Sequence, residues 1–145
     1  MATPAAEAVI ELCALAAPFT ADVQVWRADG SGDEPAGRVC TNVPHSCVLH
    51  SPVGFDCGYE GKGPADLALN ILNAFFPPRA ELPRTWYEIF HDDDPHVTLQ
   101  GFASRFALRW HQDFKLDFIA PMKPSGGRIH ARAIKRWILE HRSRP

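Results

Sequence analysis

The stretch GYEGKGPADLALNILNAF, residues 58–75, decides the fold of this 145-residue chain. It opens as a glycine-rich loop, and Pro64 suits the first turn of a helix because its missing N–H costs nothing there. The helix is expected to run to about Phe75 and to end before Pro77-Pro78. Its apolar residues surround most of the axis, which leaves only a narrow polar strip: Asp66, Asn70 and Asn73. A helix that is apolar on nearly all sides is usually the central, buried one.

The residues before this helix predict a small antiparallel sheet. Alternating apolar residues in ADVQVWRA, residues 21–28, predict a strand. Arg38–Thr41 and Cys47–His50 are predicted to form two short strands around a turn, and Phe55–Cys57 a further extended piece.

Three more helices are expected, at about residues 4–16, 99–115 and 127–142, with a loop at 119–127 before the last of them. The predicted fold is therefore α+β: a small antiparallel sheet packed on a central buried helix, with two C-terminal helices. One domain, 1–145, is expected, with the N-terminal helix peripheral to it. The predicted core contains Leu67, Ile71, Leu72, Phe102, Phe106, Trp110, Ile134, Trp137 and Ile138.

Composition narrows the class of protein. With 46% hydrophobic and 22% charged residues, the chain is not collagen-like, coiled-coil or wholly disordered. No apolar run is long enough to cross a bilayer. The N-terminal residues contain Glu7 and Glu11 and no positive n-region, so no secretory signal is expected. We therefore expect a cytoplasmic protein with free thiols, no membrane partner and no cofactor.

Charge is distributed unevenly along the chain. Residues 1–97 contain 14 Asp and Glu against 5 Lys and Arg, whereas residues 98–145 contain 3 against 10. The formal net charge of −2 therefore hides an acidic and a basic segment. Such asymmetry indicates either a charged partner or attraction between the two halves within one domain.

Residues 51–72, SPVGFDCGYEGKGPADLALNIL, carry a family resemblance. They resemble an uncharacterised family of small proteins from bacteria, phages and plasmids, in which this stretch typically reads SPTGFEWGYGGSGPAQLALAIL. Here Cys57 stands in place of Trp, Glu60 in place of Gly and Lys62 in place of Ser. The resemblance implies no activity. It implies a setting, mobile elements and phages, in which small proteins act as accessory or anti-defence factors.

The glycine loop has two interpretations. A strand, a glycine-rich loop and a helix N-terminus together suit a phosphate or other anion. The residues concerned would be Gly61, Lys62, Gly63 and Ala65. The order does not match a Walker A loop. The favoured alternative is that the glycines let a tight turn press the central helix against the sheet.

Two clusters contain residue types that bind metals. Cys40, His45, Cys47 and His50 are the right ligand types for zinc, but their spacing matches no standard finger. The run HDDDPH, residues 91–96, suits a divalent cation or a solvated acidic loop. The favoured alternative for the cysteines is buried thiols, so no metal is predicted.

Two charged surfaces are candidates for binding a partner. Cations at helical spacing share one face of the last predicted helix: Arg128, Arg132, Lys135, Arg136 and Arg142. Such a face suits phosphates or an acidic protein surface, or is an ordinary solvated face. The second candidate, an acidic docking face, comprises Glu88, Asp92, Asp93 and Asp94.

These observations favour a binding protein over an enzyme. No G-x-S-x-G, H-E-x-x-H or paired Cys/His signature is present, and no catalytic residue is predicted. The leading hypothesis is a phage or mobile-element accessory protein that binds a protein stoichiometrically, for example to inhibit a host defence complex such as a CRISPR effector. The alternatives are nucleic-acid binding through the basic helix and a nucleotide- or phosphate-binding enzyme that uses the Gly58–Pro64 loop.

Overall fold

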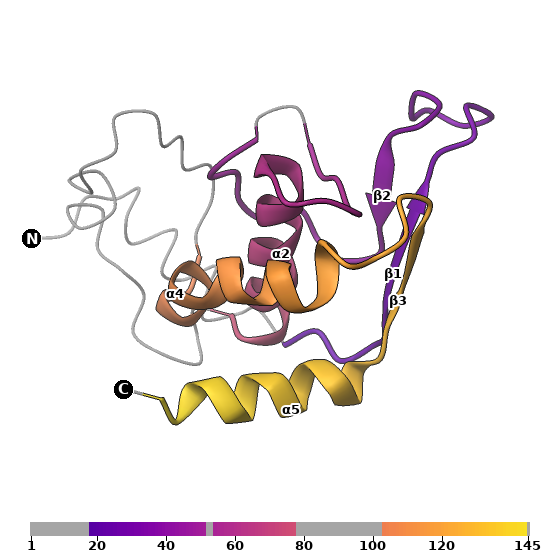
Figure 1. Cartoon of the computed structure of the whole chain (residues 1–145). Helices are drawn as coiled ribbons and strands as arrows, with labels where there is room; N and C mark the ends of the chain where they lie inside the picture. Colours follow the sequence, from indigo (N-terminus) through magenta and orange to yellow (C-terminus); the bar gives the residue numbers. More distant parts are fainter. Residues whose placement is uncertain (1–17, 52–53, 78–102, 145) are drawn as a thin grey trace, which may run out of the picture.

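A computed structural model describes residues 18–51, 54–77 and 103–144 of the chain. A small antiparallel sheet lies at one end of the described part of the chain, and three α-helices lie beside it (Figure 1). In chain order the elements are β1 (Val23–Arg27), β2 (Val39–Thr41), α2 (Lys62–Phe75), α4 (Arg105–Phe114), a π-helical segment (Lys115–Ile119), β3 (Gly126–Ile129) and α5 (Ala131–Arg142). The predicted α+β class is confirmed.

The sheet has the order β2-β1-β3, so that β1 is central and pairs antiparallel with both neighbours. Two of its strands, β1 and β2, lie where the alternation predicted them. The third prediction was wrong, because Cys47–His50 does not join this sheet. Its place is taken by β3, which comes from residues predicted as the end of a loop and the start of a helix.

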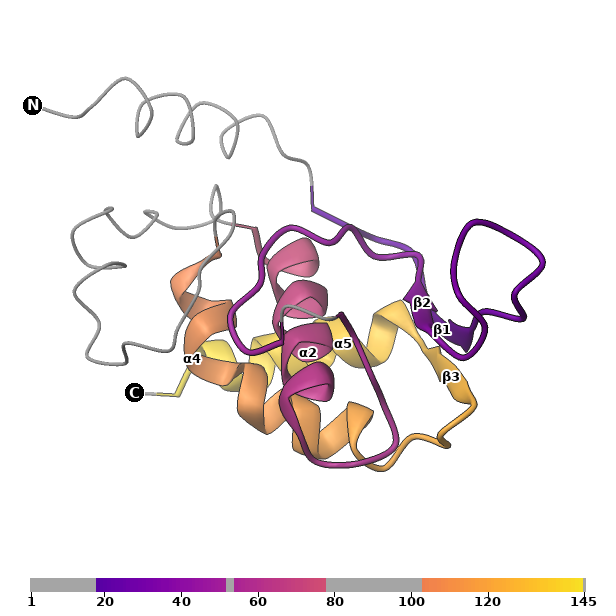
Figure 2. The ribbon, with the colours of Figure 1, turned by 90° about the horizontal axis from the view of Figure 1, so that it is seen from above.

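The polar strip of α2 explains why Cys47–His50 is not a strand of the sheet. Asn70 Oδ1 accepts hydrogen bonds from the backbone N–H of Ser46 and Cys47, at 2.7 and 3.1 Å. The Asp66 carboxylate accepts hydrogen bonds from three backbone N–H groups further along the chain, those of Leu49, His50 and Ser51. Side chains of α2 therefore satisfy the backbone donors that a neighbouring strand would otherwise satisfy. The connection between β2 and α2 passes around α2 in Figure 2.

Strand β3 depends on a glycine. Gly126 has a φ of 104°, a left-handed conformation that favours glycine. A Cβ built there would overlap the carbonyl oxygen of Val25 on β1. The last helix was predicted from about residue 127, but it begins only at Ala131. Its first N–H donates to Asp22 Oδ1 at 2.8 Å, so the side chain just before β1 caps α5.

Helix α4 begins after Ser104, whose hydroxyl accepts a hydrogen bond from the N–H of Ala107. The backbone N–H of Ser104 donates to Asn73 Oδ1 at 2.8 Å, which ties the start of α4 to α2. The π-helical segment Lys115–Ile119 follows directly, so the helical stretch ends four residues later than predicted. Residues 99–102 of the predicted helix lie outside the described residues, as does the whole predicted N-terminal helix.

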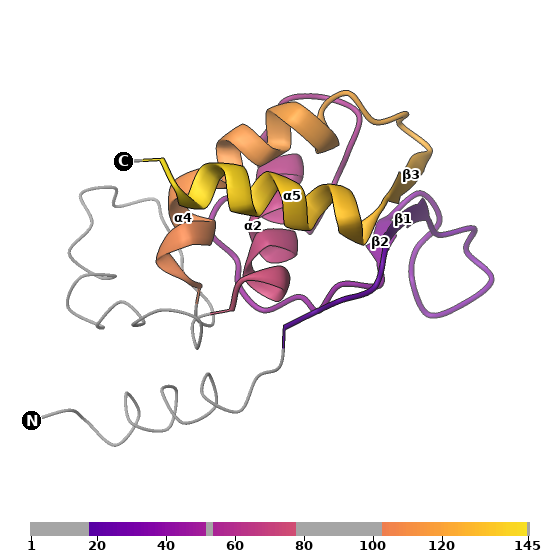
Figure 3. The same ribbon diagram turned by 90° about the horizontal axis from the view of Figure 1, so that it is seen from below.

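The predicted core is largely confirmed. Leu67, Ile71, Leu72 and Ile134 are fully buried, and Phe106, Trp137 and Ile138 are nearly so. Trp137 packs edge-on against Phe106 and Phe114, at ring-centre distances of 6.4 and 5.1 Å. Trp110 is only partly buried, which corrects the prediction for it, and Phe102 lies outside the described residues. Helix α5 lies across α4 and α2 (Figure 3), which places its inner face on this core.

Candidate binding surfaces

The glycine loop presses α2 against its neighbours. Helix α2 begins at Lys62 after Gly61, and no side chain caps it. A Cβ at Gly63 would lie 2.7 Å from the Asp56 Cβ, so glycine is needed for this close contact. The close contact at Gly63 therefore supports the interpretation that the glycines let α2 pack tightly against its neighbours. Ala65 is buried and its N–H donates to the Gly61 carbonyl oxygen, which commits that donor to the helix.

A cavity of about 390 Å³ borders this loop, and Lys62 and Gly63 are among its lining residues. On its wall, Arg27 forms an ion pair with Asp56 at 3.0 Å, and the Tyr59 hydroxyl donates to the other Asp56 oxygen. Burial opposes ionisation of Asp56, but the backbone N–H of Cys57 and the groups of Tyr59 and Arg27 together lower its pKa. The charges of Arg27 and Asp56 thus largely satisfy each other, and Lys62 is exposed.

The structure separates the four zinc candidates. Cys40 lies on β2, His45 packs on Phe55 at 4.3 Å between ring centres, and Cys47 is buried beside Asn70. Among the residues that the structure describes, no three His, Cys, Asp or Glu side chains are grouped as a metal ion would require. Burial, together with the nearby Asp66, raises the pKa of Cys47 to about 12. Cys47 is therefore a protonated, buried thiol.

His50 instead contacts His111 on α4, with 2.8 Å between their Nε2 atoms. His111 Nδ1 lies 2.8 Å from the Leu108 carbonyl oxygen, and because a carbonyl oxygen only accepts, Nδ1 carries the proton. His111 Nε2 is then the acceptor, and His50 Nε2–H is the donor. Burial, and then the neighbouring His50, lower the pKa of His111. The sequence contained no signal for this pair, because its members are 61 positions apart.

The predicted basic face is only partly assembled. Arg128 lies on β3 and pairs with Asp22 at 2.8 Å, so it does not belong to the helix. Arg142 lies at the end of α5, with its guanidinium 5.7 Å from the centre of the Phe76 ring. The remaining three cations, Arg132, Lys135 and Arg136, are exposed on α5.

Sequence reasoning did not single out Leu139, which lies among these three cations. Arg132, Lys135, Arg136 and Leu139 occupy positions i, i+3, i+4 and i+7, which form one stripe along a helix. Leu139 is 65% exposed, more than the other exposed large hydrophobic side chains of the described residues. In the described part of the chain, nothing pairs with the three cations. We call these four residues the α5 stripe.

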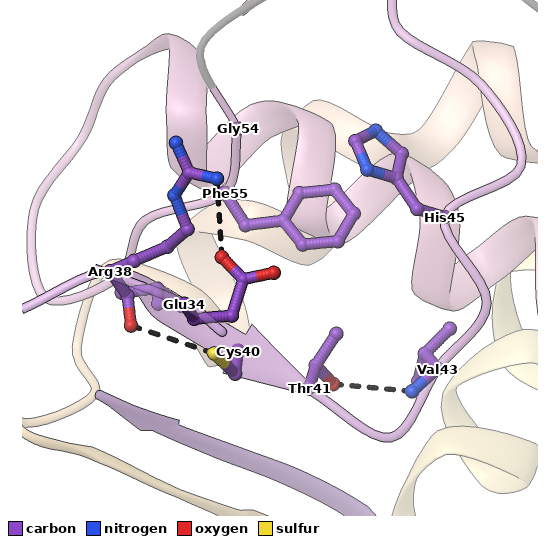
Figure 4. Close-up of a pocket in the computed structure, with 9 residues that line it drawn as sticks. Glu34, Arg38, Cys40, Thr41, Val43, His45, Gly54 and Phe55 are labelled. Atoms are coloured by element: carbon purple, nitrogen blue, oxygen red, sulfur yellow. Dashed lines mark hydrogen bonds and ion pairs between the residues drawn. The ribbon is translucent and has the colours of Figure 1, made fainter. Parts of the chain in front are cut away.

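A second, larger cavity of about 550 Å³ lies beside β2. Figure 4 shows β2 along one side of it and Phe55 and His45 on the other, with an ion pair between Glu34 and Arg38 at the rim. Its lining residues are Glu34, Arg38, Val39, Cys40, Thr41, Val43, His45, Gly54 and Phe55. The sequence did not predict this cavity, because its walls come from separate segments. The acidic docking candidates Glu88, Asp92, Asp93 and Asp94 lie outside the described residues.

In the described residues these features give an α+β fold with a buried polar network, an exposed cationic stripe on α5 and two neighbouring cavities beside β2. Residues 23–93 match the sequence model of a family of unknown function (DUF6166). The match spans the stretch 51–72 that carries the sequence resemblance. No curated protein and no solved structure matches the chain. No helix in the described ranges is long and apolar enough to cross a membrane.

Proposed function

We propose that this chain is a binding protein of a phage or another mobile element, and that it acts by forming a stoichiometric complex with a partner protein. The observation that carries the proposal is the α5 stripe, in which an exposed leucine lies among three exposed cations. Solvated helix faces normally carry polar residues. A large apolar side chain exposed beside cations on such a face is typical of a docking surface.

The α5 stripe specifies the chemistry of the partner. Burial of Leu139 would contribute about 1.5–3 kcal/mol, so the partner needs an apolar depression at this point. Arg132, Lys135 and Arg136 would be met by carboxylates, which steer the encounter and fix its register. The proposed partner surface is therefore acidic with an apolar centre.

Host defence complexes, such as CRISPR effectors, are the targets that we propose to test first. Support for this choice comes from the resemblance of residues 51–72 to proteins of phages and plasmids. A defence complex that binds nucleic acid has a cationic channel for it. The acidic segment Asp92–Asp94 would complement the charge of such a channel.

The test is co-purification of the full chain with candidate defence complexes. The double variant Arg132→Glu/Arg136→Glu should weaken a complex by at least about tenfold, as expected for residues at the centre of an interface. Leu139→Ser should weaken it by a similar factor. Lys123→Glu, a charge reversal at an exposed position off the stripe, is the matched control. Charge reversal at Asp92–Asp94 tests the second docking segment, and indifference of the complex to all these changes would refute the proposal.

Nucleic-acid binding is the second candidate, because the same three cations also suit phosphates. Its affinity should fall steeply with salt, and the charge reversals should reduce the salt dependence. Leu139→Ser separates the two candidates, since it should leave phosphate contacts intact and disrupt only the protein complex. A flat salt response, or no shift of DNA or RNA at low salt, would exclude nucleic acid.

A further inference from the structure

We propose that the groove between β2 and the segment Gly54–Phe55 binds an extended peptide segment of a partner protein, with an apolar side chain and a neighbouring carboxylate. The peptide adds to the sheet as a strand beside β2. This surface is separate from the α5 stripe, and the proposal does not depend on it.

The backbone of β2 presents an unused edge. The Ala28 N–H donates to the Arg38 carbonyl oxygen at 2.8 Å, and Trp26 lies opposite Cys40 in the β1–β2 register. Antiparallel pairs alternate, so the N–H and C=O groups of the residues between, Val39 and Thr41, point away from β1. None of the described residues forms a hydrogen bond with these groups. Such an edge is a template for one more strand.

The cavity of about 550 Å³ lies on this free side of β2 (Figure 4). Val39 and Val43 are buried, and with Phe55 they give it an apolar wall. Its volume falls within the range of pockets that hold small ligands and side chains. Because alternate side chains of an added strand point to opposite faces, one apolar side chain of the peptide enters the cavity.

Two cations beside the groove indicate where a carboxylate of the peptide would bind. The cavity of about 390 Å³ beside the glycine loop shares Arg38, Val39, Gly54 and Phe55 with this larger cavity, so the two adjoin, and Lys62 lines the smaller one. Lys62 is exposed, and no residue of the described segments pairs with it. Among the described residues, Arg38 forms an ion pair with Glu34 at 3.2 Å, and such an exposed pair contributes little and is easily exchanged. A carboxylate beside the apolar side chain of the peptide would therefore be met by Lys62 or Arg38.

The experiment starts with a random-peptide display library selected on the full chain. Selected peptides should share an apolar residue next to Asp or Glu. When the strongest is bound, NMR hydrogen exchange should show slower exchange of the Val39 and Thr41 amides. N-methylation of the peptide at the pairing positions should weaken binding by about tenfold for each hydrogen bond lost. This change leaves the protein untouched, so misfolding does not confuse the result.

Protein variants test the charge and the location. Lys62→Glu should weaken the peptide by at least about fivefold at low salt, as expected for loss and reversal of one exposed charge pair. Lys123→Glu and Arg132→Glu/Arg136→Glu should leave the affinity unchanged within about twofold, because neither change touches the groove. The second variant also keeps this proposal distinct from the one for α5.

Three results would overturn the proposal. The first is a selection that enriches no peptide, and the second is a bound peptide that leaves the Val39 and Thr41 amides exchanging as before. The third is a concentration-dependent dimer that protects the same amides without peptide, because the edge would then belong to a second copy of the chain.

Discussion

Removal of the Asp66 carboxylate should destabilise the protein strongly, although Asp66 touches no candidate binding surface. Asp66 is completely buried in the middle of α2. Its Oδ1 accepts from the N–H groups of Leu49 and His50, at 3.2 and 2.9 Å, and its Oδ2 accepts from Ser51 at 2.8 Å. Asp66→Ala leaves all three donors without an acceptor.

The magnitude follows from the burial of these donors. A buried donor left unpaired costs about 1–3 kcal/mol. Leu49 and His50 are half-buried, so each cost is taken near the lower bound, whereas Ser51 is buried and its cost is taken as higher. The sum is about 4 kcal/mol, out of a total stability of about 5–15 kcal/mol for a domain of this kind. The melting temperature should fall by about 10–15 °C.

Urea denaturation followed by circular dichroism measures this loss. Asp66→Asn keeps an acceptor at one oxygen position but places an NH₂ group against the Ser51 N–H, so its loss should be about half as large. Asp113→Ala, at an exposed position on α4, is the matched control and should change the free energy of unfolding by less than about 0.5 kcal/mol. A free energy of unfolding of Asp66→Ala within about 1 kcal/mol of the wild type would refute this expectation.

Three further predictions concern titration, backbone and thiols. Because the folded state holds the His111 pKa below its ordinary value of 6.5, the unfolded chain takes up this proton first, and stability should fall as pH drops below about 6.5. Urea denaturation at about pH 5 and pH 7.5 should show this loss, and His111→Gln should reduce it; an unchanged pH dependence contradicts the assignment. Gly126→Ala should destabilise by several kcal/mol, on the order of 2–4, whereas Gly32→Ala, which faces open space, should cost little; equal melting temperatures would disprove the argument. Iodoacetamide at about pH 8 should modify Cys40 and spare Cys47, whose pKa is raised to about 12 by burial. Mass spectrometry of the alkylated native protein measures which thiol reacts, and modification of Cys47 before Cys40 would contradict this prediction.

The central helix was predictable because its signal is local. Pro64 at its start, Pro77 after its end and the all-round apolar pattern lie within one short stretch. The same stretch also contains the polar strip, but the sequence did not show which groups the strip binds. Asp66 and Asn70 bind the backbone of residues 46–51, and nothing in that segment itself shows that its amides are already satisfied. A strand was therefore predicted where side chains replace the strand partner.

The error at β3 has a different origin. Arg128 fits the helical spacing of the later cations, so periodicity extended the last helix backwards. The strand depends on the close approach of Gly126 to β1, which is a contact between residues about 100 positions apart. Local pattern cannot supply such a pairing. The same limit explains why the groove beside β2 and the contact between His50 and His111 were not predicted.

The structure resolves the uneven charge of the chain into two parts. Some cations of the basic segment neutralise the acidic one within the domain, as in the pairs Arg128–Asp22 at 2.8 Å and Lys115–Glu60 at 3.9 Å. Arg128 has a further constraint, since the same Asp22 accepts from the first N–H of α5, so this pair fixes the junction between β3 and the helix. The three cations of the α5 stripe lie beyond this junction and contribute nothing to the described core. If the α5 stripe serves to bind a partner, Arg132→Glu/Arg136→Glu should leave the melting temperature of the isolated chain nearly unchanged. Asp22→Ala should lower that temperature, because it removes the cap of α5 and an ion pair together.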